Sequence, residues 1–215
     1  MKACRRKCRR SIKSPGKQEI LEAARRVFIR KGYQAATMKD VVEESGLSRG
    51  GVYMYYGSTE EMMLALVEQI DRSNETDYDR AIGADGSVWG AIERLMDQTQ
   101  QEAETVTDSL VPALIEFFIN AWRSRKYDAL MEERYRRGAQ ILEAFLQNGV
   151  DRGEFRPIVP VGAVVLMLLS FYDGLMVQAV QLGPEAAQTR VGLDTMLEAL
   201  RHLLQVQDGN KEVSP

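Results

Sequence analysis

The sequence contains little of the residue chemistry that metal sites and disulfide scaffolds require. It holds one histidine, His202, and two cysteines, Cys4 and Cys8, which lie in an arm with almost no apolar residues. Two such cysteines build no disulfide scaffold, and one distant histidine cannot complete a zinc site with them. We therefore expect neither a metal nor a cofactor.

Catalytic motifs are also missing from the sequence. No nucleophile lies beside a base, no carboxylates are paired in a motif, and no glycine-rich loop has the spacing of a phosphate-binding loop. His202 precedes Leu203 and Leu204, a setting more typical of an interface histidine than of a general base. We therefore expect no enzyme activity, although a helical-bundle enzyme or small-molecule carrier without a DNA-binding role remains an alternative.

The apolar runs are too short for a secretion signal or a membrane span. Residues 1–13 are basic, but no apolar segment follows them. The apolar run that begins at Val161 is interrupted at Asp173, whereas a membrane-spanning helix needs roughly 20 apolar residues. These features predict a cytoplasmic protein with no membrane partner.

The charges are distributed unevenly along the chain. Residues 1–60 contain 14 Lys or Arg against 6 Asp or Glu, a balance of +8, whereas residues 61–215 contain 14 against 25, a balance of −11. A basic first quarter joined to an acidic remainder favours a module that binds a polyanion such as DNA. A solvated, charged arm explains the same balance equally well.

The apolar pattern predicts an all-α fold. Apolar residues recur at helical spacing, and no sustained alternation typical of strands is present. We expect a basic flexible arm at residues 1–14, a three-helix helix-turn-helix domain at 15–58, a larger helical domain at 59–208 and a disordered tail at 209–215. The expected helices of the larger domain cover residues 59–80, 87–105, 109–124, 126–149, 160–182 and 188–206.

Helix caps define the helix-turn-helix. Thr37 and Asp40 have the spacing of a capping box, which opens the second helix of the domain. A turn at Gly46 follows, and Ser48 caps a third helix that extends through Tyr56. Two short helices across such a turn are typical of a DNA-binding helix-turn-helix.

Two adjacent glycines make the third helix unusual. Gly50 and Gly51 each weaken a helix by about 1 kcal/mol relative to alanine, so a purely structural helix seldom carries both. Glycine lets the backbone approach another surface closely. On the same helix, Arg49 is suited to a guanine edge and the Tyr53 hydroxyl to a phosphate oxygen.

Short motifs in a characteristic order occupy the segment from Lys17 to Leu66. They are Ala23-Ala24-Arg25-Arg26-Val27-Phe28, Gly32-Tyr33, Thr37, Asp40-Val41-Val42, Gly46-Leu47-Ser48-Arg49-Gly50, Val52-Tyr53-Met54-Tyr55-Tyr56 and Glu60-Glu61. Together they resemble the DNA-binding domain of TetR-type transcriptional regulators. The stretch from Thr37 to Glu61 is similar, more specifically, to the YfiR-like branch of that family.

The resemblance implies roles for individual residues. Thr37, Tyr53 and Tyr55 would contact phosphates, while Arg49 and the Gly51 backbone would lie against bases. With the helix cap included, the predicted DNA-binding residues are Thr37, Ser48, Arg49, Gly51, Tyr53 and Tyr55.

Two positions depart from the family pattern. Many members carry lysine where this chain has Gly57 and Thr59, so two phosphate contacts expected from the family are weakened or absent. The basic arm would compensate if it reaches DNA. The alternative is a flexible leader without fixed contacts.

The resemblance also implies an effector site in the larger domain. Met and aromatic side chains suit flat apolar ligands, and carboxylates within apolar runs suit a cationic group or an orienting hydrogen bond. Core packing is the alternative for the apolar residues, and solvent exposure or an arginine partner for the carboxylates. The predicted effector-binding residues are Trp89, Met96, Glu116, Phe117, Trp122, Tyr172, Asp173 and Met176.

Two long apolar helices near the end of the chain predict a homodimer. The helix at 160–182 is apolar on several faces, and the helix at 188–206 adds a second apolar surface. The resemblance implies that both pair with their symmetry mates, whereas an intrachain bundle core is the alternative. The predicted interface residues are Leu169, Val180, Met196, Leu200 and Leu203.

These observations predict a ligand-responsive, DNA-binding transcriptional regulator. It would be a repressor that a small, largely apolar effector releases from a near-palindromic, double-stranded operator. The alternatives are the helical-bundle enzyme or carrier named above and a helical adaptor without an effector.

Overall fold

Helices make up all the regular structure that is described. The computed structural model describes residues 16–82, 86–122, 125–185 and 187–207. The arm predicted at 1–14 and the tail predicted at 209–215 therefore lie outside the described residues. Within the described ranges no strand is present, which confirms the predicted all-α fold.

The helices follow the predicted order along the chain. The helix-turn-helix comprises α1 (Lys17–Lys31), α2 (Met38–Ser45) and α3 (Arg49–Tyr53). The remaining elements are α4 (Thr59–Ile82), α5 (Val88–Glu104), the short 3-10 helix η1 (Val106–Asp108), α6 (Val111–Trp122), α7 (Asp128–Asp151), α8 (Val161–Leu182) and α9 (Thr189–Leu204).

The third helix is shorter than predicted. It ends at Tyr53 rather than at Tyr56, although Met54 keeps helical backbone angles. The Tyr55 amide donates to the carbonyl of Val52 at 3.0 Å, three residues back, so the last turn tightens and the α-helix stops.

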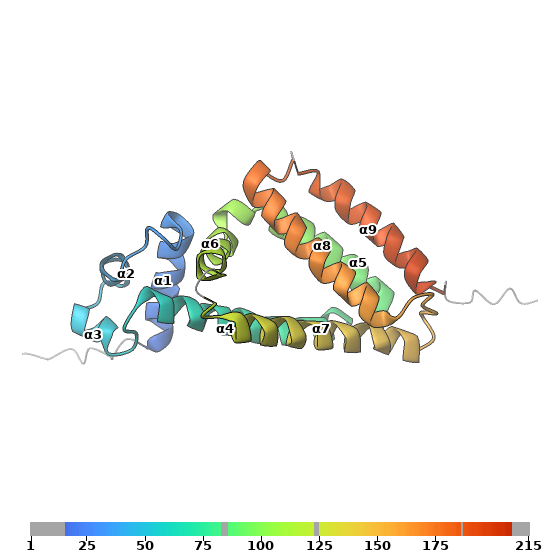
Figure 1. Cartoon of the computed structure of the whole chain (residues 1–215), viewed down its shortest axis with the longest axis horizontal. Helices are drawn as coiled ribbons and strands as arrows, with labels where there is room; N and C mark the ends of the chain where they lie inside the picture. Colours follow the sequence, from blue (N-terminus) through green and yellow to red (C-terminus); the bar gives the residue numbers. More distant parts are fainter. Residues whose placement is uncertain (1–15, 83–85, 123–124, 186, 208–215) are drawn as a thin grey trace, which may run out of the picture.

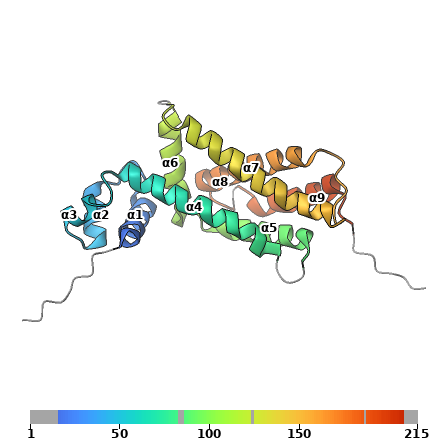
Figure 2. The same cartoon turned by 90° about the horizontal axis from the view of Figure 1, so that it is seen from below.

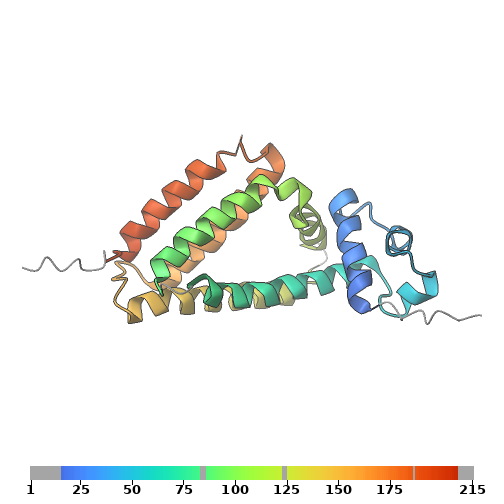
Figure 3. The ribbon, with the colours of Figure 1, turned by 180° about the vertical axis from the view of Figure 1, so that it is seen from behind.

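The helices form an elongated molecule with the helix-turn-helix at one end. Figure 1 shows α1 to α3 at the left, α4 leaving them along the base of a triangle, and α5 and α8 along its opposite side. Figure 2, from below, shows α7 beside α4, and Figure 3, from behind, shows α5 in front of α8. α6 stands between α1 and the near end of α8 and closes the triangle (Figure 1).

The apolar core at the helix-turn-helix end of the molecule includes part of α6. Buried residues of α1, α2, α3 and the start of α4 form one cluster with Leu110, Ala113 and Phe117. A separate cluster joins α5, α7, α8 and α9. The core of the helix-turn-helix therefore extends beyond the domain boundary expected at residue 58.

Phe117 joins α6 to α1 through aromatic contacts. Its ring centroid lies 4.9 Å from that of Tyr33 in an edge-on arrangement, and the Tyr33 centroid lies 5.8 Å from that of Phe28 in α1. Such pairs stabilise a core beyond the apolar area that they bury. Phe117 is 2% exposed and is therefore a core residue of the helix-turn-helix end.

Replacing Phe117 with alanine should lower the free energy of unfolding by about 3 to 5 kcal/mol, because it leaves a cavity where α6 meets α1. Ile119→Ala is the matched control on the same helix. Its side chain is 65% exposed, so the change should stay within about 0.5 kcal/mol. Urea unfolding of both variants checks this. Similar small losses for the two would contradict the core assignment of Phe117.

Candidate nucleic-acid interface

A complete capping box fixes the start of α2. The Thr37 hydroxyl accepts from the Asp40 amide at 3.3 Å, and the Asp40 carboxylate accepts from the Thr37 amide at 2.9 Å. Lys31, at the end of α1, donates to the same carboxylate at 2.6 Å. Hydrogen bonds from Lys31 and Thr37 lower the pKa of Asp40 to about 2. The predicted capping role of Thr37 is thus confirmed.

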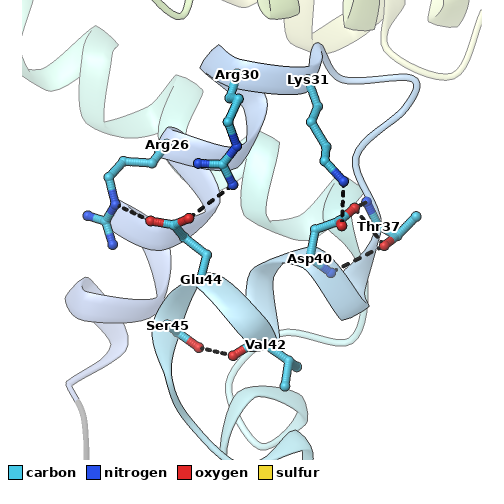
Figure 4. A network of polar contacts seen from close by, with 8 residues as sticks. All are labelled: Arg26, Arg30, Lys31, Thr37, Asp40, Val42, Glu44 and Ser45. Carbon is cyan, nitrogen blue, oxygen red and sulfur yellow. Dashed lines mark hydrogen bonds and ion pairs between the residues drawn. The ribbon is translucent and has the colours of Figure 1, made fainter.

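A second carboxylate ties α2 to α1. Glu44 accepts from Arg26 at 2.7 Å and from Arg30 at 3.0 Å (Figure 4). Both arginines hold the pKa of Glu44 below its usual range. Because their guanidinium groups point toward α2 in Figure 4, they orient the two helices rather than extend away from the module.

Ser48 caps α3, and the positions of α3 differ in exposure. The Ser48 hydroxyl accepts from the Gly51 amide at 3.1 Å, so the predicted cap is present. Val52 and Tyr56 are buried against the module, and Gly51 and Tyr55 are partly buried. The exposed positions are Ser48, Arg49, Gly50, Tyr53 and Met54.

Arg49 stacks on an aromatic ring one turn further along. Its guanidinium carbon lies 5.1 Å from the centroid of the Tyr53 ring. Stacking leaves the edge of a planar guanidinium available for hydrogen bonding. The structure therefore brings Ser48, Arg49 and Tyr53 together on one exposed surface, while Thr37 is exposed at the start of α2.

The predicted DNA-binding set leaves out two exposed positions, one in α3 and one directly after it. The predicted set contained Gly51 and Tyr55, which are partly buried, but not Gly50 and Met54, which are exposed. The signal that identifies them is the four-residue helical period, since Val52 and Tyr56 are the apolar row and positions two residues away face outward.

The helix-turn-helix module carries no net charge. Residues 16–61 hold seven Lys or Arg and seven Asp or Glu, so the balance of +8 found for residues 1–60 comes almost entirely from the seven cations of residues 1–13. Arg25, Arg26, Arg30, Lys31 and Lys39 contact carboxylates, whereas Lys17 and Arg49 contact tyrosine rings. The arm, not the folded module, therefore supplies the basic charge of this end of the chain.

Comparison with known proteins agrees with this arrangement. Residues 20–66 match the family model described as bacterial regulatory proteins, tetR family, and residues 91–190 match the model described as tetracyclin repressor-like, C-terminal domain. The HTH-type transcriptional regulator YfiR of Bacillus subtilis is 37% identical over 196 residues, which cover 84% of this chain and 91% of YfiR. The chain belongs to the TetR family.

Two further similarities extend the comparison. The HTH-type transcriptional repressor AcnR of Corynebacterium glutamicum is 26% identical over 160 residues, which cover 74% of this chain and 79% of AcnR. A TetR transcription regulator from Haloarcula marismortui shares the fold with a TM-score of 0.70 at 21% identity, over 89% of this chain and 98% of that structure. This TetR-family chain is therefore a transcription regulator and not an enzyme.

Two residues of the predicted effector set contact the DNA-binding module of this TetR-family protein. Phe117 lies in the module core, and the Glu116 carboxylate accepts from the Gln34 amide at 3.1 Å. The predicted set is consequently dispersed. Trp89 and Met96 belong to the second core, Trp122 is exposed at the end of α6, and Tyr172, Asp173 and Met176 lie on α8.

Asp173 is exposed rather than buried within its apolar run. Its carboxylate accepts a hydrogen bond from the Tyr135 hydroxyl of α7, and this bond is the largest of the effects that raise the pKa of Tyr135 to about 12. Tyr172 points to another helix, since its hydroxyl lies 3.4 Å from the Glu102 carboxylate of α5. Both residues therefore connect α8 to its neighbours in the chain.

The predicted dimer residues divide into two groups. Leu200 is fully buried and Met196 is 8% exposed within a single chain, because both pack into the core of α5, α7, α8 and α9. Leu200 therefore has no surface in the single chain to offer a partner subunit, and Met196 has little. Leu169, Val180 and Leu203 are partly buried.

Other apolar side chains on α8 and α9 are more exposed. Leu166 and Leu182 of α8 are 67% and 60% exposed, and Val191 of α9 is 60% exposed. By length and composition alone α8 could also cross a membrane, and most of it is not buried within the chain.

Proposed function

We propose that this TetR-family regulator is a homodimeric repressor that a small, largely apolar effector releases from a near-palindromic operator. The observation that carries the proposal is the exposed surface of α3, where Arg49 and Tyr53 stack on each other and face away from the module core. A family member with this surface is suited to placing α3 in a major groove.

The division of charge supports a two-part mode of DNA binding. The folded module has no net charge, so its contacts give position and sequence readout rather than bulk electrostatic attraction. The seven cations of residues 1–13 supply the non-specific attraction to phosphates. The arm thus compensates for the absence of the lysines that many family members carry at the positions of Gly57 and Thr59.

Helix α6 and the start of α7 provide the route by which an effector acts on α3. Glu116 and Phe117 of α6 contact the module, and Lys126 and Tyr127 both donate to Glu60 at the start of α4. Their hydrogen bonds hold the pKa of Glu60 below its usual range. An effector that moves α6 or α7 would therefore tilt the whole module.

A partly buried ion pair strengthens this route. Arg134 of α7 binds both oxygens of Asp71 of α4, at 2.8 Å from each of two nitrogens, and its guanidinium carbon lies 5.2 Å from the Phe118 ring of α6. Three helices therefore meet at one side chain. Linkage requires effector and operator to weaken each other by the same factor, typically about 5- to 150-fold.

The exposed apolar residues of α8 and α9 support a two-fold dimer. Exposed apolar surface remains on these two long helices at Leu166, Leu182 and Val191. A partner subunit, rather than a lipid bilayer, would cover this surface. We infer that the protein is cytoplasmic. Two copies of α3 would then face successive major grooves, with half-sites about one helical turn apart or somewhat more.

Arg49→Ala should reduce discrimination between operator and scrambled duplex by about 1 to 3 kcal/mol, because Arg49 reads a base. Tyr53→Phe should weaken binding to both duplexes about equally, because it removes a phosphate contact and keeps the ring on which Arg49 stacks. Titration of each variant against both duplexes measures this. Equal losses on the two duplexes for Arg49→Ala would refute the base-reading role.

Leu166→Glu should give monomers that bind the operator much more weakly, because it places a carboxylate on the exposed apolar surface of α8. Leu200→Glu is unsuitable, since Leu200 lies in the core of its own chain. Ile158→Glu, at another exposed apolar side chain, is the control and should remain dimeric. Sedimentation and DNA titration check this, and a monomeric wild type with full operator affinity would contradict the dimer.

A further inference from the structure

The exposed surface of α3 consists of two adjacent rows. Arg49 and Tyr53 form one row, and Gly50 and Met54 form the other, each pair separated by one helical turn. The Met54 amide donates to the Gly50 carbonyl at 3.1 Å, so both residues keep helical geometry and share a face. The second row has no role in the contacts described above.

Met54 places an apolar side chain on the surface of the module. It is 78% exposed, the largest value among the exposed large apolar side chains of the described chain. Its thioether has no hydrogen-bond donor, so it cannot bind a phosphate. Burial in the free protein does not account for methionine at this position.

Gly50 has no packing reason to be glycine. A Cβ added there would meet no atom within 4 Å, and the backbone is ordinary helix, in which alanine is more stable than glycine. Gly51 differs, since an added Cβ would lie 3.3 Å from the Ser48 hydroxyl oxygen. The open space above Gly50 therefore suits a surface that approaches from outside the chain.

We propose that Met54 is a specificity-determining residue that contacts the methyl group of a thymine in the major groove, and that Gly50 leaves room for that base edge to approach. The inference rests on the proposed function, in which α3 enters the groove. The thymine methyl is the one apolar group that base pairs present there, so it is the partner that an exposed thioether fits.

Deoxyuridine lacks only that methyl group and so tests the contact directly. The probe is the duplex that the full-length protein selects from a random-sequence pool, with deoxyuridine replacing each symmetric pair of thymines in turn. When one of these thymine pairs is replaced, the affinity of the wild-type protein should fall about fourfold for each methyl group removed. Met54→Ala should lose a similar factor on the unmodified duplex and nothing further on the deoxyuridine duplex. Ile158→Ala, which truncates another exposed apolar side chain, should behave as wild type.

Two outcomes would overturn the proposal. If another residue contacts the methyl group, Met54→Ala will still bind the thymine duplex more tightly than the deoxyuridine duplex. If no residue contacts it, deoxyuridine will not lower the affinity of wild type at any position. The proposed function fails differently, because Arg49→Ala would then leave discrimination between operator and scrambled duplex unchanged. Loss of the Met54 effect with the Arg49 effect intact would reject this inference alone.

Gly50→Ala provides a second, independent variant. The free protein should melt at the same or a higher temperature, because the new methyl has space and alanine favours a helix. Its operator affinity should nevertheless fall, since the methyl occupies the room left for the base edge. Unchanged affinity would show that no base approaches Gly50 and would overturn that part of the proposal.

Discussion

The close approach of α6 to the turn after α1 holds the DNA-binding end to the rest of the chain. Gly32 has a φ of +77°, a conformation that favours glycine, and a Cβ there would lie 2.7 Å from a Glu116 carboxylate oxygen, so that side chain would have to shift. The same carboxylate accepts from Gln34, and Phe117 extends the module core into α6. The helix-turn-helix therefore cannot tilt without moving α6.

Ion pairs between α1 and α2 stabilise the module from within. Carboxylates of α2 bind Arg26, Arg30 and Lys31 of α1, so three of the seven basic residues of the module tie these two helices together. The exposed surface of α3 is left for contacts outside the module. Most of the net positive charge at this end of the chain lies in residues 1–13.

Local sequence features predicted the elements well and their partners less well. Caps at Thr37 and Ser48 and the helical periodicity located the helices because they depend on neighbouring residues. Periodicity shows which face of a helix is apolar but not which element covers it. The contacts of Glu116 and Phe117 with the helix-turn-helix and the burial of Leu200 within its own chain were therefore not predicted. The contact between Glu116 and Gly32 joins residues far apart in the chain, and one sequence alone does not reveal it.

Hydrogen exchange at the Gln34 amide tests the attachment most directly. The account predicts slow exchange of this amide in the free protein and clearly faster exchange in Glu116→Ala, while the amides of the α2 capping box keep their protection in both. Fast exchange of the Gln34 amide in wild type, with no change in the variant, would contradict the claim that α6 holds the module.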